Sequence, residues 1–122
     1  MGEYLYDNVV FIKSKGFALR VVKLYKFLTE EKKEHIISKQ ILRSGTAIGA
    51  NIAESIYAQS RSDFVSKMSI SLKEAAETKY WLDILYESGF IGKSPYESIS
   101  GDCNELIKLL SSIVKTTKER NN

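Results

Sequence analysis

Apolar residues recur every three or four positions along almost the whole chain, and this spacing constrains the fold more than any other feature. The alternation typical of a strand never holds for long, and the 122 residues include one proline, Pro95. A period near 3.6 residues is that of a helix with one side against a core. The sequence therefore predicts an all-α protein.

Two polar runs, at 29–34 and 58–63, divide the periodic pattern, and a glycine-containing turn near residue 89 divides it again. Helices of this length joined by short links pack as antiparallel neighbours. We expect an up-down-up-down four-helix bundle in a single domain spanning 1–122. Its helices are predicted at about 5–28, 35–57, 62–88 and 95–118.

Local signals mark several of these boundaries. Ser60, with Asp63 three residues later, resembles an N-terminal capping pair, although Ser62 competes for the cap. Gly89 is placed for a Schellman stop after the third helix. Ser94 and Pro95 are typical of the cap and first position of a helix, so they predict the start of the fourth.

The first helical segment carries two apolar lines rather than one. The first line contains Leu5, Val9, Ile12 and Leu19, and the second contains Val10, Phe17, Val21, Leu24 and Leu28. Such a wide apolar face exceeds what one small core requires, and the third segment shows a similar surplus. We therefore expect copies of the chain to assemble with one another.

Gly45 and Gly49 interrupt the second segment, and each costs about 1 kcal/mol against alanine in a helix interior. They predict a close helix–helix approach or a local kink.

Enzymatic and metal chemistry has few candidates in this composition. One cysteine and one histidine cannot form a disulfide framework, a zinc site or a di-iron bundle. We expect Cys103 to be a buried apolar residue and His35 to be exposed, and we expect no catalytic residue, cofactor or metal. Paired carboxylates such as Glu74 and Glu77 remain the one enzymatic option.

The chain shows no apolar run near the ~20 residues of a membrane span, and no signal peptide. A cytoplasmic location without membrane contact follows as an expectation.

The net charge is +3, with the basic excess in the first half of the chain. A solvated helix face and a phosphate-binding stripe both fit this pattern, and assembly would multiply the field. The candidate nucleic-acid contacts are Lys13, Arg20, Lys23, Lys39 and Arg43.

Polar residues also punctuate the second and third helices. If these helices pair as a hairpin about residue 60, Arg43 meets Glu77, Asn51 meets Ser69, and Glu54 approaches Lys67. Such a network either fixes the helix register or forms a binding patch. Its expected members are Gln40, Arg43, Asn51, Glu54, Glu74 and Glu77.

The run QILRSGTAIGANIAE at 40–54 resembles the signature of the bacterial four-helix-bundle proteins encoded in intervening sequences of 23S ribosomal RNA genes. Residues 62–82 resemble the third helix of that family, and 15–25 resemble its first. The sequence departs from the commoner pattern at Leu42, Gly49 and Ser55, and Leu42 weakens the case for a strongly basic second helix.

The resemblance implies a bundle that assembles into a ring, typically a homopentamer, with no established enzymatic activity. Related accessory variability proteins of diversity-generating retroelements bind nucleic acid and a reverse transcriptase. Two hypotheses follow: an adaptor that docks on RNA or DNA, and a protein-interaction scaffold with no direct nucleic-acid role.

Overall fold

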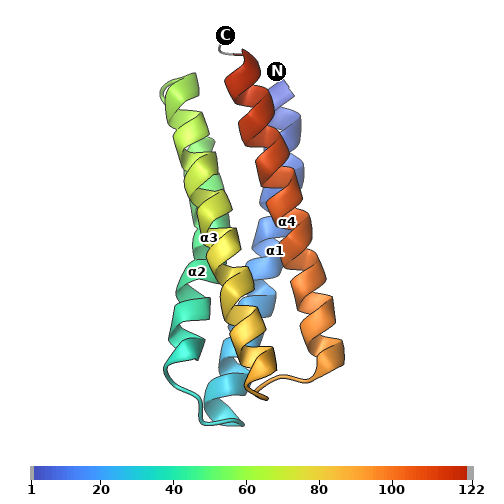
Figure 1. Cartoon of the computed structure of the whole chain (residues 1–122). Helices are drawn as coiled ribbons and strands as arrows, with labels where there is room; N and C mark the ends of the chain where they lie inside the picture. The colour runs from blue at the N-terminus through green and yellow to red at the C-terminus, as the bar shows by residue number, and fades with distance from the viewer. Residues whose placement is uncertain (1, 121–122) are drawn as a thin grey trace.

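Four antiparallel helices make up the described chain. The computed structural model describes residues 2–120, with side chains over residues 9–119. The elements are α1 (Gly2–Glu30), α2 (Ile37–Ser55), α3 (Arg61–Glu87) and α4 (Lys93–Arg120). Each helix packs against the next in the chain, and α4 returns to contact α1. Both chain ends lie at the same end of the bundle (Figure 1). The expected all-α up-down bundle is confirmed.

The fourth helix begins two residues earlier than expected, which changes the roles of its first residues. Its first turn is closed by the backbone N–H of Tyr96, which donates to the carbonyl of Gly92 at 3.0 Å. The expected cap at Ser94 is therefore wrong, because Ser94 already lies inside the helix. Pro95 is still in the first turn, where its missing N–H needs no partner.

Two other boundary signals are confirmed by their hydrogen bonds. The Ser60 hydroxyl accepts from the backbone N–H of Asp63 at 3.0 Å, so Ser60 caps α3. Gly89 has φ +85°, and the N–H of Phe90 donates to the carbonyl of Leu85 at 2.9 Å. This is the bond pattern of a Schellman stop.

The link between α1 and α2 uses a capping group that the sequence did not indicate. Buried Glu34 accepts hydrogen bonds from the backbone N–H groups of Ile36, Ile37 and Ser38, at 3.1, 3.0 and 2.7 Å. Burial alone would raise the pKa of Glu34, but these bonds outweigh it and lower the pKa. The carboxylate thus satisfies three of the unpaired donors at the start of α2.

The core is continuous along the bundle axis. The second apolar line of α1 faces it, with Val10, Phe17, Val21 and Leu28 buried and Leu24 half-buried. One face of α4 is also buried, at Ile99, Cys103, Leu106, Leu110, Ile113 and Thr117.

Small residues bring α2 close to both of its neighbours. A Cβ added at Gly45 would lie 2.8 Å from both γ-carbons of Val21 on α1. On the other side, the hydroxyl of Ser71 on α3 donates to the carbonyl of Ile48 at 2.8 Å. The helix runs unbroken from Ile37 to Ser55, so close approach, rather than a kink, explains its glycines.

Candidate interaction surfaces

The first apolar line of α1 lies on the outside of the bundle. Val9, Ile12 and Leu19 are 49%, 69% and 60% exposed, and Phe27 continues the line at 40%. Leu5, the other expected member, lies outside the described side chains. These positions share one helix face because their spacings are close to whole turns. The two lines predicted for this helix therefore have different roles, one in the core and one on the surface.

The same helix is strongly basic along its exposed length. Between residues 9 and 29 it carries five lysines and arginines and no acidic residue. Lys13 and Arg20 are paired with α4: Lys13 lies 3.2 Å from Glu105 and Arg20 lies 2.6 Å from Asp102. The remaining cations, Lys15, Lys23 and Lys26, are exposed and have no ion pair with any described residue.

The five cations expected to contact nucleic acid are thus not equally free. Lys13, Arg20 and Arg43 each meet a carboxylate of this chain, which neutralises much of their field. Lys23 on α1 and Lys39 on α2 are exposed and unpaired within the described residues. Fewer of these five cations are therefore free to bind phosphate than the sequence indicated.

The Arg43 cluster forms where the hairpin register predicts it. The guanidinium donates to both carboxylate oxygens of Glu74 at 3.2 Å and to Glu77 at 2.6 Å. The indole N–H of Trp81 donates to Glu77 at 3.0 Å. These bonds, from Trp81 first and then Arg43, lower the pKa of Glu77. The side chain of Arg43 is 51% exposed, so the cluster is a surface feature.

The rest of the expected polar network is separate from this cluster. Glu54 accepts from Lys67 at 3.0 Å, as the register predicts. Asn51 does not reach Ser69, because its amide donates to the carbonyl of Ala47 on its own helix at 2.9 Å. Gln40 is exposed and hydrogen-bonds to no described side chain. Three of the six expected residues therefore form the Arg43 cluster. Glu54 pairs with a lysine outside the set, and Asn51 and Gln40 contact no other member of it.

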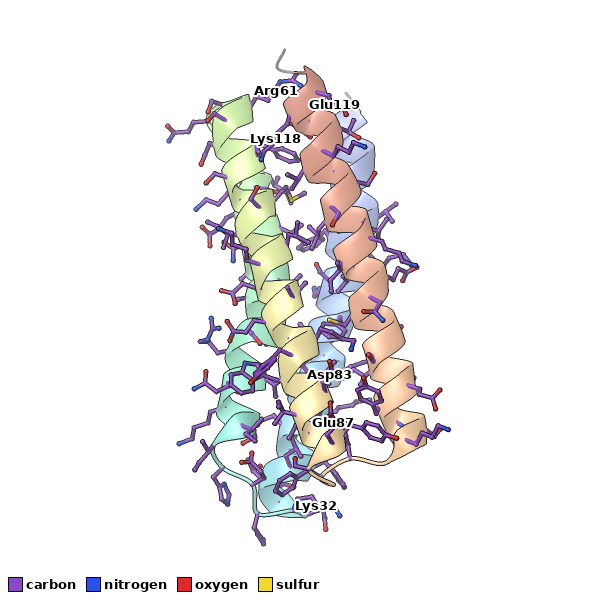
Figure 2. All side chains as sticks on the ribbon, in the orientation of Figure 1. Lys32, Arg61, Asp83, Glu87, Lys118 and Glu119 are labelled. Carbon is purple, nitrogen blue, oxygen red and sulfur yellow. The ribbon has the colours of Figure 1, made fainter. Side chains whose placement is uncertain are left out.

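A polar contact joins α3 and α4 that was not predicted from the sequence. The hydroxyl of Tyr96 donates to Asp83 at 2.5 Å, and Lys79 donates to the same carboxylate oxygen at 2.6 Å. Asp83 lies on the side of α3 that faces α4 (Figure 2). Tyr96 also stacks on Tyr86, with ring centroids 4.3 Å apart. The link between α3 and α4, at 88–92, is as short as the link between α2 and α3, so a hairpin register about residue 90 would have paired Asp83 with Tyr96.

Two hollows lie along the boundary between α1 and α4. One, of about 390 Å³, opens between the second half of α1 and the start of α4, and the other, of about 310 Å³, lies beside the Lys13 and Arg20 ion pairs. The first is lined by Arg20, Lys23, Leu24, Phe27, Ile91, Gly92, Pro95 and Ile99.

The single cysteine and the single histidine were the remaining candidates for thiol or metal chemistry. Cys103 is buried, and burial raises the pKa of its thiol to about 12, so it remains protonated at neutral pH. His35 is exposed. Within residues 2–120, no three His, Cys, Asp or Glu side chains are grouped to hold a metal ion. None of the four helices, over the same range, has the length and apolarity of a membrane span.

These features define an antiparallel four-helix bundle in which the exposed face of α1 carries both apolar and basic side chains. The family described as 23S rRNA-intervening sequence protein matches residues 6–112, and the chain belongs to that family. The resemblance inferred from the motifs on the second and third helices is confirmed to this extent.

The chain is also similar to a solved structure. It is the crystal structure, at 1.70 Å resolution, of a protein of unknown function from the S23 ribosomal protein family of Bacteroides thetaiotaomicron VPI-5482. The two are 58% identical and superpose with a TM-score of 0.89, over 90% of this chain and 98% of the other. No curated protein matches this chain.

Proposed function

We propose that this protein is a non-enzymatic, self-assembling interaction scaffold whose assembly surface is the outer face of α1. The observation that carries the proposal is the exposed line Val9, Ile12 and Leu19 on the first half of that face. Copies that bury this line against one another remove apolar surface from water without disturbing the core.

The position of these residues on one helix face indicates an interface rather than chance exposure of single side chains. Single exposed apolar side chains are ordinary on protein surfaces, whereas several on one helix face form the larger apolar surface that typically marks an interaction site. From Val9 to Leu19 the line extends about 15 Å along the helix axis. A closed ring with five copies is the assembly that the family resemblance suggests.

The double variant Ile12→Ser and Leu19→Ser tests this proposal. Both side chains point away from the core, so the variant should fold while losing self-association, and sedimentation velocity should show the mass of one chain, 13.8 kDa. Ile36→Ser is the matched control, because Ile36 is 76% exposed in the α1–α2 link and away from the line. An unchanged assembly in the double variant would reject α1 as the interface.

Nucleic-acid docking is the second candidate, and the unpaired cations of α1 favour it. Lys15, Lys23 and Lys26 lie on a helix with no acidic residue between positions 9 and 29. Assembly would repeat this field in each copy, and phosphate contacts made this way do not depend on base sequence. The protein partner that the family resemblance suggests for such an adaptor is a reverse transcriptase.

Filter binding with RNA and duplex DNA at low and moderate salt separates the two candidates. If α1 contacts phosphates, changing Lys15, Lys23 and Lys26 to glutamine lowers the slope of log K against log salt, by about 0.9 for each lost contact on duplex DNA. The control changes three exposed lysines of α3 and α4 to glutamine: Lys73, Lys108 and Lys115. No binding at low salt would leave the scaffold as the function.

A further inference from the structure

The larger hollow between α1 and α4 combines an apolar interior with a positively charged mouth. The most buried residues of its lining are Ile91 and Ile99, which are 7% and 5% exposed, and Leu24, Phe27 and Pro95 are also apolar. Its volume, about 390 Å³, lies in the range of small-molecule sites in proteins. The size and lining suit a compact apolar group.

The charge at this hollow is of one sign. Of the side chains that line it, Arg20 and Lys23 are the charged ones, and no carboxylate is among them. Asp102 partly neutralises Arg20, but Lys23 has no ion pair with any described residue. Arg20 and Lys26 lie three residues before and after Lys23 on the same helix, where like charges repel. An anion at this mouth would relieve that repulsion.

We propose that this hollow binds a small ligand with an apolar body and a single carboxylate. The apolar body contacts Ile91, Ile99 and Phe27, and the carboxylate lies beside the ammonium group of Lys23. Charge complementarity decides the class of ligand. A cation would be repelled by Lys23 and Arg20 at the mouth, and a neutral ligand could accept hydrogen bonds from them but would lack the charge attraction that a carboxylate has.

The size of the hollow and its apolar walls exclude two other anions. A polyphosphate requires several free cations and polar donors, whereas one free lysine lies at this mouth above an apolar interior. A long acyl chain has more volume than this hollow, which holds about 390 Å³. A single aromatic ring or a short branched chain fits both limits.

Three compounds with the same body test the proposal: 3-phenylpropionate, 3-phenylpropan-1-ol and 3-phenylpropylamine. Each is titrated into the full chain while the methyl NMR signals of Ile91 and Ile99 are followed. We expect the carboxylate to shift these signals with about fivefold higher affinity than the alcohol, the upper limit of an exposed ion pair. Equal affinity of the three compounds, or methyl signals that do not move, would overturn the proposal.

Three variants locate the binding. Lys23→Glu should remove the preference for the carboxylate, whereas Lys26→Glu, an equal charge change outside the lining, should keep most of it. Gly92→Val should block entry of all three compounds, because it adds a branched side chain to the lining of the hollow. The fold should tolerate this change, since a Cβ at Gly92 meets only the Pro95 ring, at 3.7 Å. Equal losses in both lysine variants, or full binding by Gly92→Val, would place the ligand elsewhere. Binding of acidic peptides but not of 3-phenylpropionate would also contradict the proposal.

Discussion

Lys33 has the one positive φ among the non-glycine residues of the described chain, at 55°. It occupies the turn after α1, where the N–H of Glu34 donates to the carbonyl of Leu28 at 2.9 Å. A side chain in this left-handed conformation costs about 1 kcal/mol, a cost that glycine avoids. We predict that Lys33→Gly raises the free energy of unfolding by about 0.5–1 kcal/mol in urea titrations.

The neighbouring substitution Lys32→Gly is the control, because Lys32 has no positive φ. Glycine there adds freedom to the unfolded chain and removes the ammonium group that lies 5.7 Å from the centroid of the Phe27 ring. We expect it to lower stability slightly. A loss of stability in Lys33→Gly would contradict the conformational argument.

Glu34 makes the stability of α2 depend on pH. Because its pKa is lowered in the folded state, its contribution is present above the pKa of the unfolded chain and is lost as the pH falls through the folded value. We predict that Glu34→Gln costs about 1–2 kcal/mol at pH 7 and that its difference from the wild type shrinks in acid. Denaturation midpoints across pH 2–7 measure this.

Glu31→Gln provides the comparison for this pH series. Glu31 is exposed, and its carboxylate accepts no hydrogen bond from a described residue. It should change stability by less than about 0.5 kcal/mol. The cap would contribute no pH dependence if the difference in stability from the wild type were as independent of pH for Glu34→Gln as for Glu31→Gln.

At the scale of the helices, the approach of α1 to α2 limits what can replace Gly45. An alanine Cβ there would lie 2.8 Å from the γ-carbons of Val21, which is fully buried in the core. We predict that Gly45→Ala lowers stability by about 1 kcal/mol or more, although alanine favours the helix. Gly101→Ala on α4 meets nothing within 4 Å and should raise stability by up to about 1 kcal/mol. Calorimetry of both variants shows whether the signs are opposite.

The Asp83–Tyr96 hydrogen bond couples α3 to α4. A double-mutant cycle with Asp83→Asn and Tyr96→Phe should give an interaction energy of about 1 kcal/mol in urea unfolding. The pair is partly exposed, which keeps the value modest. Strictly additive effects would mean that the bond does not hold the helices together.

How far the sequence predicted these elements depends on whether a signal is local. Ser60 and Gly89 act through bonds within a few residues, and their roles are confirmed. The pairing of Arg43 with Glu77 followed from the short α2–α3 turn, which sets a hairpin register. Asn51 was misplaced because the backbone of its own helix competes for its amide. The bond between Tyr96 and Asp83 was not predicted, because the hairpin register was applied to the α2–α3 turn and not to the equally short α3–α4 link.

For the molecule as a whole, periodicity predicted two apolar lines on α1 but not which one faces the core. That choice depends on how α2 and α4 pack, and it leaves Ile12 and Leu19 among the most exposed apolar residues. It also decides the candidate site, because the surface line and the unpaired lysines share this helix.

The central claim is that this exposed line is covered by other copies of the chain. The mass of the wild-type protein in solution, measured by light scattering over a range of concentrations, tests it most directly. The account predicts a multiple of 13.8 kDa that persists on dilution. A mass of 13.8 kDa at every concentration would contradict it.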